Sequence, residues 1–247
     1  MVFQGQFANH RIRYQFRYPN TALYMRPYIK AIEGDEYDIL ASKEHIERHR
    51  PYYTECTEDA YVEYKSLIEL TSRFLLSHKF CIFHAVAFCW KGYAWLVTGP
   101  SGAGKTTQYK KWKSMYKDEV QMICGDMPLL EWKEDGRIWV HPTPWNGKER
   151  IRGNVSAPLG GIVILEQQKI NSIESIIPYV SGVPLLHQMA IRPETEEQII
   201  RMADLLNRLL QACPVWKLKN CGDQAAVQMT ALTFKEHLKG VDVKKAE

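Results

Sequence analysis

The chain has 247 residues, of which 45% are hydrophobic and 24% charged, the balance of a globular protein with one sizeable core. Its net charge of +4 is mild and dispersed, so it does not indicate nucleic-acid binding. No apolar run approaches the ~18 residues of a membrane-spanning helix, and the first residues lack the order of a signal peptide. The six cysteines form no CxxC pair and no metal-like spacing with histidine. We therefore expect a cytoplasmic protein with free thiols and with neither nucleic acid nor membrane as a partner.

Residues 1–79 are expected to form a short β-rich segment with one helix, packed on a core of residues 80–247. Within the first part, residues 11–18 alternate polar and apolar side chains, which predicts a half-buried strand. We expect residues 22–29 to form its partner and residues 37–40 to form another short strand.

Two consecutive strands follow the helix of this segment. Helical spacing of apolar residues predicts that helix over 57–77, with acidic residues in its first turn. The strands are predicted over 81–90 and 93–98, joined only by Lys91-Gly92. Such a short linker with glycine is typical of a hairpin, so the second strand should run antiparallel to the first.

Residues 99–107 match the phosphate-binding loop pattern GxxxxGK[ST], between this strand and a helix predicted over 108–117. The backbone N–H groups of such a turn surround an anion at the helix N-terminus. In this pattern Lys105 reaches the β- and γ-phosphates and the Thr106 hydroxyl ligates Mg²⁺. The sequence therefore predicts a nucleoside triphosphate site formed by Gly99, Ser101, Gly102, Ala103, Gly104, Lys105, Thr106 and Thr107.

The remainder of the chain mixes short strands with amphipathic helices. Residues 141–158 are rich in proline, glycine and charge, which indicates a surface loop. The other elements are predicted as strands over 120–124, 129–132, 137–140, 161–165 and 215–218, and as helices over 194–212 and 223–238. This order predicts an α+β fold with a mixed, largely antiparallel sheet and flanking helices.

Three features in order along the chain resemble the kinase core of HPr serine kinases, whose wider fold family includes the phosphoenolpyruvate carboxykinases. They are the histidine-bearing stretch 83–86, the phosphate loop and the acidic strand end 122–126. Residues 143–149 also resemble the PWxGKE motif of a small HPr-kinase-like branch that includes lasso-peptide kinases. The resemblance covers residues 81–165 well, the C-terminal third loosely and the first 75 residues hardly at all. It implies a P-loop kinase core of the carboxykinase-like fold.

The resemblance also implies roles for three further side chains. Asp126 would be the catalytic base or a Mg²⁺ ligand, although an aspartate before Pro128 also fits a plain turn cap. HPr kinases usually have two consecutive aspartates at this place, whereas this chain has Gly125-Asp126, so one role is missing or moved. His84 would steer the substrate or the γ-phosphate, or else be a core histidine. Lys148 would contact the developing phosphate charge, or else belong to a solvated basic turn.

Two other residues near these motifs leave alternatives open. Trp145 either pins its loop or stacks on a nucleobase, and we favour pinning. Glu166 follows the strand predicted over 161–165, where it either reaches the metal or lies on the surface, and we favour the surface.

The function expected from these features is an ATP- and Mg²⁺-dependent kinase that phosphorylates a hydroxyl, such as the serine of a peptide or small protein. The catalytic residues would be Asp126, Lys105, His84 and Lys148, with Thr106 and Asp126 on the metal. One alternative is a non-catalytic nucleotide-binding protein or NTPase switch, which the missing acidic residue at Gly125 favours. A carboxykinase-like lyase is the other, and the length of the chain disfavours it. HPr kinases assemble as hexamers, so a homo-oligomer stays open.

Overall fold

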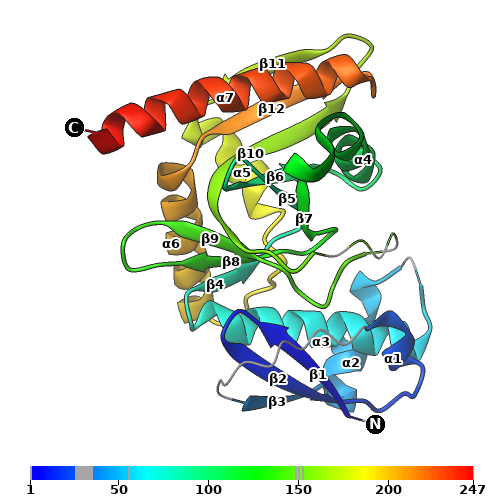
Figure 1. The fold of residues 1–247 in the computed structure, drawn as a ribbon. Coiled ribbons are helices and arrows are strands. Elements are labelled where there is room, and N and C mark those ends of the chain that lie inside the picture. The colour runs from blue at the N-terminus through cyan, green and yellow to red at the C-terminus, as the bar shows by residue number, and fades with distance from the viewer. Residues whose placement is uncertain are drawn as a thin grey trace.

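The computed structural model of the chain describes residues 2–25, 36–54, 56–147, 149, 151 and 153–246. A small three-stranded sheet with helices α1, α2 and α3 lies at one end of the molecule, and a larger sheet with helices α4 to α7 lies at the other (Figure 1). Between them run the strands β4, β8 and β9 and the loops that follow β7 and β9 (Figure 1). The fold is thus mixed α and β, with the two parts in contact.

The small sheet has the order β1 (Val2–Phe7), β2 (His10–Gln15) and β3 (Glu36–Leu40). Strand β1 runs antiparallel to β2, and β3 runs parallel to it. The predicted pairing of residues 22–29 with this strand is wrong, because Thr21–Tyr24 forms the short helix α1. The Thr21 hydroxyl is buried and bonds to the Glu63 carboxylate, which docks α1 on α3 instead of on the sheet. Residues 26–29 lie outside the described residues.

Helices α2 (Lys43–His49) and α3 (Asp59–Leu76) complete this part, with a 3-10 turn at Arg50–Tyr52 between them. Helix α3 confirms the helix predicted over 57–77. One of its faces is apolar and closes a core cluster that joins the N-terminal elements to the rest of the chain. Members of this cluster from the two sides include Phe7, Ile12, Leu67, Leu75, Phe80, Ile82, Leu129 and Trp145.

The long strand β10 (Ala157–Gln167) connects the two halves of the large sheet, because its first and later residues pair with different strands. Its first residues pair with β9 (Ile138–His141), which continues to β8 (Leu129–Trp132) and β4 (Phe80–Ile82), all antiparallel. Its later residues run parallel to β6 (Tyr93–Thr98) and to β12 (Val215–Asn220). Beyond these lie β5 (Val86–Trp90) with β7 (Gln121–Cys124) on one side, and β11 (Ser172–Ile176) on the other.

The hairpin predicted at Lys91-Gly92 is confirmed. Both residues have positive φ, 53° and 78°, the conformation of a tight two-residue turn. Strands β5 and β6 are antiparallel, with Val86 opposite Val97. The strand predicted over 81–90 is instead two strands, β4 and β5, because the amides of His84 and Ala85 bond to the carbonyls of Gln188 and Asp126 rather than to a neighbouring strand.

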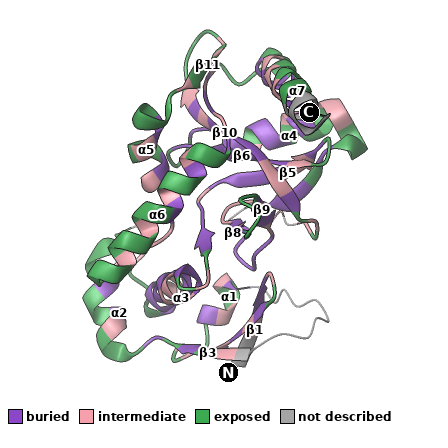
Figure 2. Ribbon diagram, turned by 90° about the vertical axis from the view of Figure 1, so that its left-hand side faces the viewer, coloured by how far each residue is buried: buried purple, intermediate pink, exposed green. Residues whose placement is uncertain are grey.

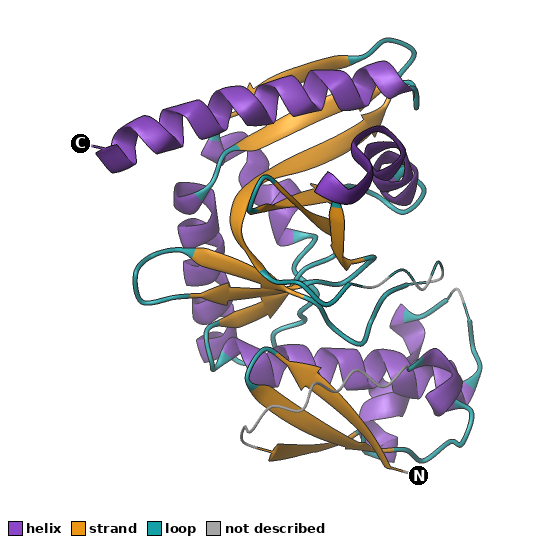
Figure 3. Cartoon of the chain, viewed as in Figure 1, coloured by secondary structure: helices purple, strands orange, loops and turns teal. Residues whose placement is uncertain are grey.

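Helices cover both faces of the large sheet (Figure 3). Helices α4 (Lys105–Tyr116) and α7 (Gln224–Ala246) supply side chains to one apolar cluster, which contains Trp112 and Phe234. On the other face, α5 (Pro178–Leu186) and α6 (Glu196–Ala212) supply Leu185, Leu205 and Leu209 to a second cluster. Figure 2 shows the strands between them as mostly buried. No helix among the described residues is long and apolar enough to cross a membrane.

The loop predicted at the surface over 141–158 is in part buried. Its first half packs inward because Trp145, 1% exposed, lies 5.0 Å from the ring of Phe7 in the shared core. The polar groups that accompany Trp145 are paired: the Thr143 hydroxyl donates to the Met127 carbonyl, and the Asn146 amide donates to the Thr143 carbonyl. The residues at the two ends of the range belong to β9 and β10.

Replacing Phe234 by alanine is expected to lower the free energy of unfolding by about 3–5 kcal/mol. The Phe234 ring is fully buried and stacks on Trp95 with centroids 3.6 Å apart. Urea unfolding followed by tryptophan fluorescence measures the change. Leu232→Ala is the matched control on the same helix, since Leu232 is 60% exposed, and equal losses in the two variants would contradict this description of the core.

Candidate nucleotide-binding and catalytic site

The glycine-rich loop joins the end of β6 to the start of α4, as the motif requires. Gly99, Gly102 and Gly104 have φ of 143°, 83° and 96°, values that side-chain-bearing residues rarely adopt. Gly99 also lies against β10, where a Cβ would be 3.0 Å from the Leu165 carbonyl oxygen. The first helical residue of α4 is Lys105, so the loop ends at a helix N-terminus, where free N–H groups and the helix dipole favour an anion.

The Lys105 ammonium is folded back over the loop. It is 9% exposed and donates to the carbonyl oxygens of Gly99, at 2.9 Å, and Pro100, at 3.1 Å. Burial lowers its pKa, and the Asp126 carboxylate acts in the opposite direction. Since the Asp126 charge acts on Lys105, the structure brings these two residues of the predicted site together.

His84 and Asp126 lie side by side at the same edge of the sheet. The His84 Nε2 atom is 3.4 Å from an Asp126 carboxylate oxygen, and its Nδ1 atom is 3.2 Å from the Gln188 side-chain oxygen. About a third of each side chain is exposed, 32% for His84 and 29% for Asp126. The Thr98 hydroxyl, just before the loop, donates to the His84 carbonyl at 2.7 Å. A partly open acid–imidazole pair therefore stands beside the phosphate loop.

The walls around Asp126 come from segments far apart in the sequence. A Cβ at Gly147 would be 2.9 Å from the Asp126 Cβ, so only glycine allows this approach. Tyr64 of α3 has a raised pKa, first because it is buried and second because of the Asp126 charge. Tyr64 and Gln188 were missed from the sequence, since no motif marks contacts across such separations. Gly147 belongs to the stretch 143–149 that resembles the PWxGKE motif.

The residue before Asp126 has no room for a side chain. A Cβ at Gly125 would lie 2.4 Å from the backbone oxygen of Ile151 and 3.1 Å from that of Asn146. A second aspartate, which HPr kinases usually have at this place, is therefore excluded by the backbone of the following loop. The packing of the backbone at Gly125 therefore leaves Asp126 as the carboxylate at the end of this strand.

The other expected site residues have varied positions. Thr106 is partly exposed in the first turn of α4. Glu166 forms an ion pair with Lys217 at 2.8 Å, and both side chains are 36% exposed, which agrees with a surface position. Trp145 is buried in the core and pins its loop. Lys148 lies outside the described residues.

The part of this edge that the structure describes has no group of three potential metal-ligating side chains. Among the described residues, the group of potential ligands that comes together is His45, His49 and Glu69, in the N-terminal part. At the phosphate loop, the oxygens that the sequence assigns to a metal are the Thr106 hydroxyl and the Asp126 carboxylate. That donor set fits Mg²⁺, which is commonly held by one or two protein ligands together with substrate phosphates.

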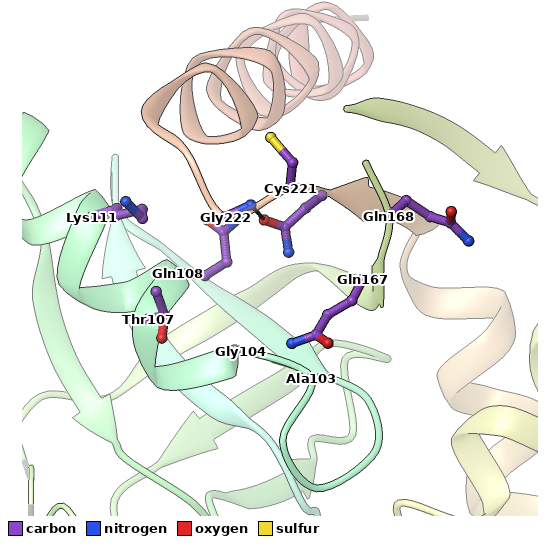
Figure 4. A pocket seen from close by; sticks show the side chains of 10 residues that line it. Ala103, Gly104, Thr107, Gln108, Lys111, Gln167, Gln168, Cys221 and Gly222 are labelled. Atoms are coloured by element: carbon purple, nitrogen blue, oxygen red, sulfur yellow. Dashed lines mark hydrogen bonds between the residues drawn. The ribbon is translucent and has the colours of Figure 1, made fainter. Parts of the chain in front are cut away.

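A polar pocket of about 280 Å³ adjoins the loop where α4 begins (Figure 4). One wall is formed by Ala103, Gly104, Thr107, Gln108 and Lys111, and the other by Gln167, Gln168, Asn220, Cys221 and Gly222. The second wall is the carboxyl end of β10 and the turn between β12 and α7. Sequence reasoning missed this pocket because its two walls are more than 50 residues apart in the chain.

Comparisons with known proteins give partial likenesses. No protein-family model matches the chain. A uridine kinase from Chlamydia pneumoniae is 28% identical over 133 residues, 47% of this chain and 60% of that protein, so the chain spans less than two thirds of this relative's length. The solved HPr(Ser) kinase/phosphatase of Coxiella burnetii aligns with a TM-score of 0.39 at 11% identity, covering 67% of this chain and 95% of that one.

Gly125→Asp is expected to destabilise the fold rather than complete a two-aspartate site. The new side chain would collide with backbone atoms, which cannot move as a side chain can, so we expect a loss of about 1–3 kcal/mol or more. Thermal unfolding measures it. Gly240→Asp is the matched control, since a Cβ at Gly240 meets nothing within 4 Å. A Gly125→Asp protein as stable as the parent would show that the backbone of Asn146 and Ile151 does not lie against Gly125.

Proposed function

We propose that this protein is a kinase-type phosphotransferase that uses ATP and Mg²⁺ to phosphorylate a hydroxyl group, with the serine of a peptide or small protein as the acceptor. The observation that carries the proposal is the convergence of Lys105, Asp126 and His84 at the phosphate loop. The His84–Asp126 distance of 3.4 Å and the charge coupling of Asp126 to Lys105 support a single site.

The phosphate loop would bind the β- and γ-phosphates through its backbone amides and Lys105. In this protein the Lys105 ammonium is satisfied by two loop carbonyls. Phosphate oxygens are stronger acceptors for an ammonium than neutral carbonyls are, so a nucleotide would draw Lys105 away from them. The Thr106 hydroxyl and the Asp126 carboxylate would hold Mg²⁺, which would supply charge neutralisation at the phosphates.

Asp126 would orient the acceptor hydroxyl and accept its proton. Phosphoryl transfer depends mainly on positioning and on charge neutralisation, with a carboxylate at the attacking hydroxyl. His84 would hold the carboxylate in place, because Gln188 fixes the other side of its imidazole ring. As one carboxylate is present at this strand end, the base and metal roles would fall on the same residue.

The acceptor is proposed from sequence motifs rather than from contacts. Residues 143–149 resemble the PWxGKE motif of kinases associated with peptide modification, which favours a peptide acceptor and a carboxykinase-like P-loop core. The relative named uridine kinase is also a phosphotransferase by its name. Uridine is therefore a second acceptor to compare with peptides.

The test is phosphate transfer from γ-labelled ATP, with Mg²⁺, to a library of serine-containing peptides and separately to uridine. Label on a peptide, located by mass spectrometry, is the expected result. Lys105→Ala and Asp126→Asn should each lower the rate by about 100-fold or more, because each removes a charge that stabilises the transferring group. EDTA should abolish transfer.

Two exposed residues provide matched controls. Lys239→Ala and Asp118→Asn make the same chemical changes at exposed positions and should leave the rate unchanged. Transfer to uridine but not to peptides would overturn the acceptor class. ATP hydrolysis with no acceptor phosphorylated under any condition would overturn the kinase assignment and favour an NTPase switch.

A further inference from the structure

The polar pocket beside α4 is a second binding region that the proposed catalytic residues do not use. It touches Gly104 and Thr107, and its lining includes none of Lys105, His84 and Asp126. Its volume of about 280 Å³ is near the lower limit for pockets that hold small organic ligands. A ligand that filled it would therefore be continuous with whatever the phosphate loop binds.

The lining of this pocket is unusual in its chemistry. It contains four side-chain amides, a hydroxyl, a thiol and one ammonium, and no carboxylate: Gln108, Gln167, Gln168, Asn220, Thr107, Cys221 and Lys111. Without a carboxylate it does not suit a divalent cation. Amides offer donors and acceptors in one plane, which matches the edge of a planar heterocycle that carries both kinds of group.

Gln108 gives an independent indication that a ligand belongs here. The residue is 2% exposed, and neither the oxygen nor the nitrogen of its amide has a hydrogen-bond partner. Leaving buried polar atoms unpaired costs about 1–3 kcal/mol for each, so such atoms usually have a function. In Figure 4 the Gln108 side chain rises from α4 toward the turn at Gly222. Gln108 lines the pocket although its amide is buried, and rotation about its soft terminal torsion would turn the amide atoms toward a ligand.

On the opposite wall, the residue toward which Gln108 points is Gly222, which has no side chain (Figure 4). Gly222 has φ of +84°, and a Cβ there would meet nothing within 4 Å. The Gly222 amide is held by the Asn220 side-chain oxygen at 2.6 Å, which fixes the turn. Because no side chain projects from Gly222, a planar ring has room to lie along the backbone of this turn.

We propose that this pocket binds the nucleobase of the phosphate donor and that the Gln108 amide selects adenine. A glutamine amide pairs with adenine through one donor and one acceptor, the N6 amino group giving a proton and a ring nitrogen receiving one. The assignment rests on the proposed function, since it takes the donor to be a nucleoside triphosphate. To the proposed function it adds the identity of the nucleobase, adenine, and the residue that recognises it, Gln108.

The test compares three probes on the full-length protein by isothermal titration calorimetry: ATP, GTP and inorganic tripolyphosphate. Tripolyphosphate reports on the phosphate loop alone. In Gln108→Met, which keeps the length of the side chain and removes its hydrogen bonds, ATP affinity should fall about 10- to 100-fold. Tripolyphosphate affinity should stay within about twofold. Gln211→Met, at an exposed glutamine of α6, is the matched control.

The outcomes separate this inference from the proposed function. An unchanged ATP affinity in Gln108→Met, an equal loss for tripolyphosphate, or an equal or larger effect on GTP would each overturn the base assignment while leaving the kinase proposal standing. A parent protein that binds neither ATP nor tripolyphosphate would overturn both. Thermal unfolding of each variant verifies that it is folded.

Discussion

The antiparallel pairing of β5 with β6 is the constraint on which the site depends. Because two residues join the strands, the start of β5 must lie beside the end of β6, with Val86 opposite Val97. Strand β7 is antiparallel to β5 in turn, so its end, with Cys124 opposite Ala87, reaches the same edge. Adjacent strands lie about 4.8 Å apart. His84, the phosphate loop and Asp126 therefore meet without any of them being held by a long loop.

A local break in the sheet gives this edge its shape. At residues 83–85 the chain leaves the ladder, and the amides of His84 and Ala85 bond to the carbonyls of Gln188 and Asp126 at 2.7 and 2.8 Å. These bonds satisfy amides that would otherwise be buried without partners, which would cost about 1–3 kcal/mol each. They also join the segment after α5 to the strand end that carries the acid. The position of His84 thus depends on the C-terminal third of the chain.

Features set by neighbours in sequence were predictable, and features set by distant contacts were not. The phosphate loop, the Lys91-Gly92 turn and the helix over 59–76 follow from local patterns, and all three are present. Asp126 could be chosen because it follows an apolar strand. The sequence favoured Trp145 as a residue that pins its loop, but its packing partner could not be predicted, since Phe7 comes from the other end of the chain. The same holds for the exclusion of a side chain at Gly125, which arises from the backbone of Ile151.

Helix α4 carries one residue of each proposed site, Lys105 and Gln108, within a single turn. Lys105 and Gln108 are three residues apart, so they lie on adjoining parts of the helix surface, and both are buried. Lys105 is coupled to Asp126, whose walls come from α3 and from the loop at Gly147. Gln108 faces the ends of β10 and β12 instead. Under the two proposals, acceptor and donor recognition would rest on different neighbours of this helix, α3 on one side and the ends of β10 and β12 on the other.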